Sequence, residues 1–171
     1  STNTSTSEVI IENDNRCRFM RYKTNEIIVY IHFKQINELI FNGSDSLTNE
    51  GVLSLNNFKL ETLGAAGSIA LNIDANEIHC INESGWPDIE FSGSCNVFRV
   101  RIHGNQYFNS MQLDVNESIT VISNAGTTSK INSQDCMLRV ELSGTGDLWF
   151  YGVPTEIVKK EDTSGKLIDK N

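Results

Sequence analysis

Apolar and polar residues alternate along most of this chain in short runs, and Gly or Asn residues separate the runs. The runs are rich in Ile, Val, Phe and Leu, and the chain contains only two prolines. Alternation with a period of two is typical of β-strands, whereas a helix needs apolar residues three or four positions apart. The pattern therefore predicts an all-β fold built from short strands.

A repeat of twenty residues relates these strands to one another. Asn56, Asn76, Asn96 and Asn116 are spaced by twenty, and Cys136 continues the series. In this frame residues 57–156 align as five segments without gaps, and a partial copy follows them. Repeats of this length are typical of solenoids, in which each repeat stacks on the one before it.

Three columns of this alignment are mainly apolar, and a basic column lies between two of them. The apolar columns are Phe58, Ile78, Phe98, Ser118, Leu138 and Val158; Leu60, Cys80, Val100, Thr120 and Val140; and Leu71, Phe91, Met111, Ile131 and Tyr151. The basic column, beside Glu61, Glu141 and Glu161, holds Lys59, His79, Arg99, Arg139 and Lys159. Residues two apart in a strand point to the same face, so we expect the apolar columns to form one core and the basic column to face water.

Two further columns indicate where each rung turns. Stacked Asn side chains at a turn can hydrogen-bond from rung to rung, which gives the Asn column a role. A second column predicts the corner between two strands of a rung, because glycine is favoured at tight turns. It contains Gly64, Gly104 and Gly144 together with Ser84, Asn124 and Ser164.

The matching columns decide the architecture. An antiparallel sandwich with strands every ten residues would explain the spacing of the strands but not the columns. We therefore predict a single-stranded right-handed parallel β-helix, or β-solenoid, with about 20 residues per rung and roughly seven rungs. One solenoid domain is expected over residues 8–171, after a polar leader at residues 1–7 that is either a disordered terminus or a flexible tether.

Composition excludes several classes of function. Hydrophobic residues make up 39% and charged residues 21%, as in a globular domain. The formal net charge of −8 argues against nucleic-acid binding, and no apolar run is long enough for a transmembrane segment. The four cysteines lack metal-like spacing, so we expect no metal and no cofactor. We interpret them as free core thiols, with pairing in an exported protein as the alternative.

A family resemblance rests mainly on the C-terminal third. The run VELSGTGDL at residues 140–148, followed by Gly152 and Pro154, resembles the last repeats of the bacterial head GIN domain family. Residues 164–168 (SGKLI), 29–39 (VYIHFKQINEL) and 57–61 (NFKLE) extend the resemblance to about residues 8–168. The middle corners, such as residues 83–86 (ESGW), depart from the Ser-Gly-Ser-Gly-Asp corners of the family.

The resemblance implies a place and a role, but no reaction. The family is common in Bacteroidetes and is described as auto-transporter adhesins. It implies an extracytoplasmic module in the periplasm or at the cell surface, either secreted or a lipoprotein, whose export signal has been removed from this chain. No activity of the family can be transferred.

Aromatic residues near the corners are the first candidates for ligand binding. Trp86, Tyr107 and Trp149 could stack on sugar rings, because aromatic faces on an extended sheet suit that contact. The same residues could instead plug corners or form a dimer contact. The partner is therefore expected to be a glycan or a cell-surface protein.

An acidic pair supplies the alternative, enzymatic interpretation. Asp74 and Asp114 share a column with Ser94 between them, which separates them by two rungs, or roughly 9.6 Å. That distance is at the edge of the range for an inverting carboxylate pair in a pectinase or polysaccharide lyase-like enzyme. The three histidines fall in different columns and complete no nucleophilic set. We predict a non-catalytic surface-binding module, with a structural or assembly module that associates through solenoid ends or faces as a further alternative.

Overall fold

The computed structural model describes residues 8–11 and 28–171 of the chain. The chain divides into two units, residues 1–32 and 33–171, and every strand of the described residues belongs to the second unit. The predicted leader at residues 1–7 lies outside the described residues. A single domain over residues 8–171 stays a prediction.

The described part of the chain contains strands and no helix, and all strand pairs are parallel. The strands are β1 (Glu38–Phe41), β2 (Leu47–Thr48), β3 (Leu53–Thr62), β4 (Ser68–Asn82), β5 (Asp88–Ile102), β6 (Tyr107–Ser123), β7 (Ser129–Asn132), β8 (Met137–Leu142), β9 (Leu148–Tyr151), β10 (Glu156–Glu161) and β11 (Leu167–Asp169). Three of them are 15 to 17 residues long, because each passes through both layers of the coil.

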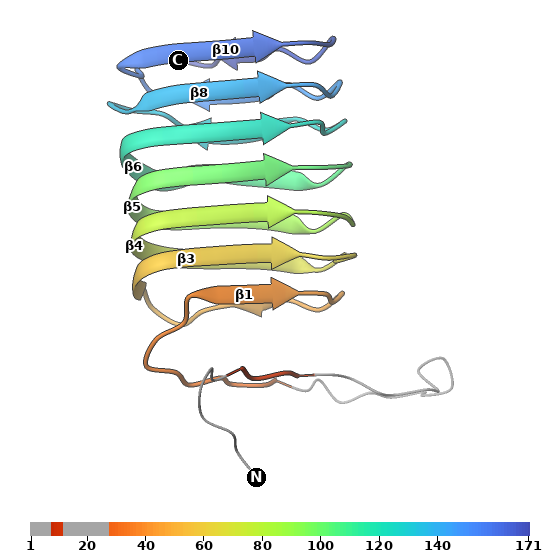
Figure 1. Ribbon diagram of the computed structural model, residues 1–171, viewed down its shortest axis with the longest axis vertical. Helices are drawn as coiled ribbons and strands as arrows, with labels where there is room; N and C mark the ends of the chain where they lie inside the picture. The colour runs from red at the N-terminus through yellow and green to blue at the C-terminus, as the bar shows by residue number, and fades with distance from the viewer. Residues whose placement is uncertain (1–7, 12–27) are drawn as a thin grey trace. The chain divides into compact units, whose positions relative to one another are not determined.

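Each rung runs first through one sheet and then through a second. The first sheet contains β2, the N-terminal parts of β3 to β6, and then β7, β9 and β11. The second sheet stacks β1, the C-terminal parts of β3 to β6, β8 and β10 (Figure 1). In Figure 1 the nearer strands run from left to right as the chain climbs, so the coil is right-handed. Seven strands stack in the second sheet, so the predicted solenoid of about seven rungs is confirmed.

The predicted columns hold for the first rungs and shift by one residue later. Leu60 pairs with Cys80 and Cys80 with Val100, at the expected spacing. Strand β6 then carries extra residues, with register shifts between Glu90 and Ser92 and between Cys95 and Val97. The one-residue shift moves side chains to the opposite face.

Several positions in the predicted columns are therefore wrong. In the basic column Val158 pairs with Arg139, in place of Lys159. Ile119 and Val121 occupy the places expected for Ser118 and Thr120, and Ile157 stands in place of Val158. In the third column Ser110 and Phe150 pair with Ile131, in place of Met111 and Tyr151. Cys136 is buried and so does not continue the outward Asn column.

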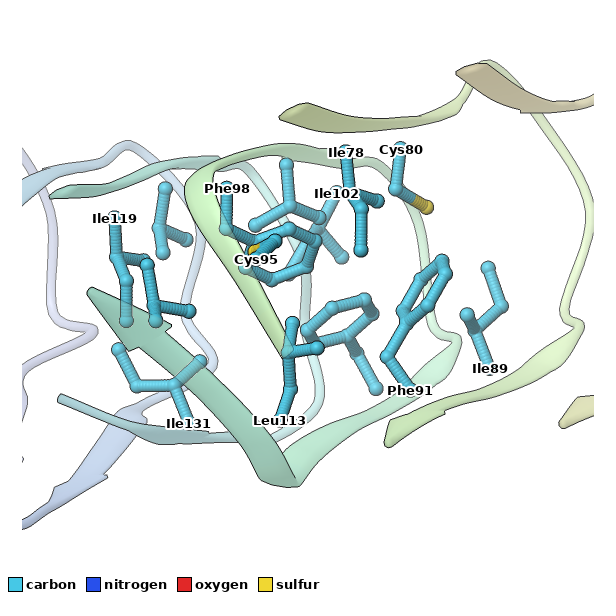
Figure 2. Packing of buried hydrophobic residues seen from close by; sticks show 14 of the residues in the cluster. Ile78, Cys80, Ile89, Phe91, Cys95, Phe98, Ile102, Leu113, Ile119 and Ile131 are labelled. Atoms are coloured by element: carbon cyan, nitrogen blue, oxygen red, sulfur yellow. The ribbon is translucent and has the colours of Figure 1, made fainter. Parts of the chain in front are cut away.

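The inward columns of the two sheets meet in one core (Figure 2). Phe91 of the first sheet packs against Phe98 of the second, with ring centroids 5.6 Å apart, and Phe108 of the next rung contacts both. Cys80, Cys95 and Cys136 are buried and free, as predicted, while Cys17 lies outside the described residues. Burial raises the pKa of the Cys80 and Cys95 thiols to about 12, so these residues act as small apolar side chains.

Glycines form the corners that lead from the second sheet of one rung to the first sheet of the next. Gly64 and Gly104 adopt positive φ angles of 64° and 77°, as the predicted Gly column requires. A Cβ added at Gly144 would lie only 2.1 Å from the backbone oxygen of Ala125 in the rung below. We call this side of the coil the Gly edge. The opposite side, where the chain bends at residues 56, 76, 96 and 116, is the Asn edge.

Candidate functional site

The aromatic candidates do not form one cluster. Trp86 lies in the Gly-edge corner before β5 and is 68% exposed. Tyr107 begins β6 on the next rung, where it pairs with Asp88, two residues after Trp86. Trp86 and Tyr107 therefore lie near each other on the Gly edge. Trp149 lies in β9, two rungs beyond Tyr107. No ring contact joins the three among the described residues.

Lysines cover Trp149. The Nζ atom of Lys170 lies 4.1 Å from the ring centroid, and that of Lys130 lies 5.8 Å from it. Such cation–π contacts occupy the ring face that a sugar would need. Trp86 and Tyr107 are therefore the aromatic candidates with more accessible rings.

The acidic candidates share a column, as predicted. Asp74 pairs with Ser94 and Ser94 with Asp114, so the two carboxylates are two rungs apart. The Ser94 hydroxyl donates a hydrogen bond of 2.9 Å to Asp74. The amide of Asn132 donates one of 3.2 Å to Asp114. Each carboxylate thus has a partner on a neighbouring rung and an exposed side.

The Asn column beside these acids forms a side-chain ladder. The Nδ2 atom of Asn96 donates to the Oδ1 atom of Asn76 at 3.0 Å, and that of Asn116 donates to Asn96 at 3.1 Å. This confirms the predicted stacking of Asn side chains at a turn, over three consecutive rungs. Pairing of the backbone is interrupted at the same positions, because β4, β5 and β6 bend there from the first sheet into the second.

A shallow channel lies between the Asn ladder and the acidic column. The first part of this open channel has a volume of about 500 Å³. Ser54, Asp74 and Ser94 line one side of it, and the Asn column lines the other. Its continuation encloses about 300 Å³ beside Asp114, Asn116, Gln134 and Asp135. The side chains of Ala75 and Cys95 point into the core, so these residues line the channel with their backbone. Sequence reasoning found both walls as separate columns and missed the channel between them.

The outer face of the second sheet carries the basic column. Lys59 contacts Glu38 at 2.8 Å and Glu61 at 2.6 Å, and Arg99 pairs with Glu77. The hydrogen bonds to Glu38 and Glu61 raise the pKa of Lys59 above its usual value. Partial burial, followed by the charges of Lys59 and Arg101, lowers the pKa of His79. The carboxylates of Glu38, Glu61 and Glu77 thus balance the positive charges of Lys59 and Arg99, as expected for a solvated surface.

The described residues contain no group of three or more His, Cys, Asp or Glu side chains that could hold a metal ion. Nor does any helix in this part of the chain have the length and apolar character to cross a membrane.

Comparison with known families gives one match. A family model described as "Putative auto-transporter adhesin, head GIN domain" matches residues 2–154. Searches of curated proteins and of solved structures found no match.

Proposed function

We propose that this chain, which belongs to the head GIN domain family of auto-transporter adhesins, is a non-catalytic binding module that works outside the cytoplasm. The family match fits an adhesin-like protein at a cell surface. Export of the chain with removal of a signal, from a secreted or lipoprotein precursor, is part of this proposal.

The observation that carries the proposal is the construction of the coil. Its outward side chains stand in columns, one residue per rung, along two sheets and two edges. Such an array places side chains at regular intervals along the coil, which suits the binding of an extended partner. A glycan or a cell-surface protein is therefore the proposed partner.

Trp86 and Tyr107 are the proposed aromatic contacts. They stand one rung apart at the Gly edge, and their rings could stack on successive sugars or on apolar side chains of a protein. Trp149 contributes less to this surface in our proposal, because Lys170 and Lys130 lie over its ring.

The acidic pair suits binding better than hydrolysis. Two rungs separate Asp74 from Asp114, and Ser94 and Asn132 already donate hydrogen bonds to them. The general acid of a glycoside hydrolase usually lies in a buried, apolar surrounding, whereas both of these carboxylates are exposed. We therefore propose no catalytic role for either residue.

Two assays on the purified chain test this function. Labelled protein is applied to epithelial cells, extracellular-matrix proteins and immobilised glycans, and it is incubated separately with neutral and acidic polysaccharides with and without Ca²⁺. We expect saturable binding to one of the surfaces and no release of reducing ends or unsaturated products. Turnover that disappears in Asp74→Asn or Asp114→Asn would refute the non-catalytic assignment. Absence of saturable binding to every surface would refute the adhesin-like role.

Assembly through the ends of the coil is a second candidate. In the described residues β10 pairs only with β8, and β11 only with β9, so each has one edge without a partner strand. Ile157 and Val158 of β10 are exposed. Unpaired strand edges invite association. Sedimentation of the purified chain over a range of concentrations separates a monomer from an end-to-end oligomer.

A further inference from the structure

We propose that the channel along the Asn edge binds a neutral glycan chain that lies parallel to the solenoid axis. This inference rests on the proposed binding function and names its ligand class. It places the ligand on the side of the coil opposite Trp86 and Tyr107, so the two surfaces can be tested separately.

The channel has the shape that an extended polymer needs. Its walls are two parallel columns, the acidic column with Ser54, Asp74, Ser94 and Asp114 and the Asn column with Asn56, Asn76, Asn96 and Asn116. The two hollow parts meet at Asn116 and cover successive rungs spaced by about 4.8 Å. One sugar unit of an extended chain advances by about as much as one rung. A glycan along the axis would therefore meet an Asn side chain at each unit on one wall and Ser and Asp side chains in alternation on the other.

The walls keep hydrogen-bonding capacity that the fold does not use. An Asn amide has two N–H donors and an oxygen with two acceptor positions. Asn96 uses one donor toward Asn76 and accepts one bond from Asn116, so half of its capacity faces the channel or solvent. Asp74 and Asp114 each accept one side-chain bond from the protein. Sugar hydroxyls both donate and accept, and they match this mixture of amides, hydroxyls and carboxylates.

Among glycans, the charge of the channel favours a neutral chain over an anionic one. The residues lining the two parts of the channel include Asp74, Asp114 and Asp135 and no Lys or Arg. An anionic polymer would meet like charges there, and the chain as a whole carries a net charge of −8. The basic side chains Lys59, Arg99 and Arg139 lie on the outer face of the second sheet instead. No aromatic residue lines the channel, so binding there depends on hydrogen bonds.

An array of immobilised neutral and anionic oligosaccharides, followed by titration of the best-bound neutral oligosaccharide, tests this proposal. We expect binding to neutral members and little effect of added salt, because no ion pair is involved. The double variant Asp74→Ala/Asp114→Ala should bind about tenfold more weakly, as expected for the loss of two hydrogen bonds. Ser94→Arg, which fills the middle of the channel, should abolish detectable binding. Asp74 and Asp114 are exposed and Ser94 is half-buried. A melting curve for each variant confirms that it is folded.

Controls on other surfaces separate the possible outcomes. Thr120→Ala, on the outer face of the second sheet, should leave the affinity unchanged. Glycan binding that is lost in Trp86→Ala but kept in Ser94→Arg would overturn the proposed glycan site in the channel. It would instead support glycan binding by the aromatic residues of the Gly edge. Binding to cells or matrix proteins without binding to any neutral oligosaccharide would overturn the proposed glycan site in the channel, but it would support the adhesin-like function. Binding to no surface at all would refute both.

Discussion

The two edges of the coil hold successive rungs together in different ways. At the Gly edge backbone lies directly against backbone, and a Cβ at Gly85, Gly144 or Gly146 would come within 2.1 Å of a carbonyl oxygen in the neighbouring rung. At the Asn edge the rungs meet through outward side chains, in the ladder of Asn76, Asn96 and Asn116. The first arrangement leaves no room for a Cβ at these three glycines, whereas the second leaves polar groups free to contact a ligand.

This difference separates residues that the fold needs from residues that a binding site can use. Close backbone contacts cannot relax when a side chain is added, so Gly-edge substitutions should act on stability. The exposed amides of the Asn edge can exchange partners with water, so substitutions there should act mainly on binding. The predictions below test this contrast from the largest expected effect to the smallest.

The largest loss of stability is expected for Gly144→Ala. The added methyl group would lie 2.1 Å from the backbone oxygen of Ala125, and the backbone cannot move away cheaply. We expect a loss of about 3 kcal/mol in the free energy of unfolding. Gly51→Ala is the matched control, because Gly51 has a φ of 69° but no atom within 4 Å of an added Cβ. It should lose about 1 kcal/mol from backbone strain alone. Equal losses in denaturant unfolding would contradict the close-contact explanation.

Two buried amides near the Gly edge should respond with opposite signs. Gln106 is 1% exposed, and neither polar atom of its side chain has a protein partner in the described residues. Gln106→Met should therefore raise the melting temperature, with a gain of about 1 kcal/mol. Asn82 accepts a bond from Thr62 and donates one to the backbone of His103. Asn82→Leu should lose about 2 kcal/mol. Destabilisation of both variants would show that Gln106 has a partner in solution.

At the Asn edge the expected effects are smaller. Asn96→Ala removes two ladder hydrogen bonds, but the exposed amides of Asn76 and Asn116 can bond to water instead. We therefore expect a loss of about 1 kcal/mol in the free energy of unfolding. Asn56→Ala is the control in the same column, since Asn56 has no side-chain hydrogen bond in the described part of the chain. It should change stability by less than about 0.5 kcal/mol. Denaturant unfolding of the two variants measures the difference that the ladder makes.

The smallest effect is expected between the edges, on the outer face of the second sheet. Because partial burial and the charges of Lys59 and Arg101 lower the pKa of His79, the unfolded chain binds a proton more readily than the folded chain. The His79 contribution to stability is therefore complete above the usual His pKa of about 6.5 and is lost as the pH falls from that value through the lower pKa of the folded chain. His79→Ala should change the free energy of unfolding by about 0.5 kcal/mol or less at neutral pH. The variant should also lose less stability than the original chain when the pH is lowered. An NMR titration that places the His79 pKa above the usual value would contradict this.

The sequence was sufficient to predict the fold and the Asn ladder because both follow from a fixed period. The same period misplaced Ser118 and Thr120, because the connection before β6 is one residue short and β6 then carries two extra residues. Shorter spacing after β6 keeps the average at about twenty. The apolar neighbours Ile119 and Val121 carried the signal for this shift, because moving the frame by one residue restores the apolar columns. The channel could not be predicted, since it depends on how β4, β5 and β6 bend between two columns that are unremarkable one at a time.

The most direct test of the account is an NMR titration of the isotopically labelled chain with cellohexaose, a neutral hexasaccharide. It compares the side-chain amide signals of Asn76, Asn96 and Asn116 with the indole signal of Trp86 in the same spectra. We predict that the Asn amide signals shift and saturate together, whatever the Trp86 indole signal does. A shift of the indole signal without the Asn signals, or no saturable shift at either edge, would contradict the account.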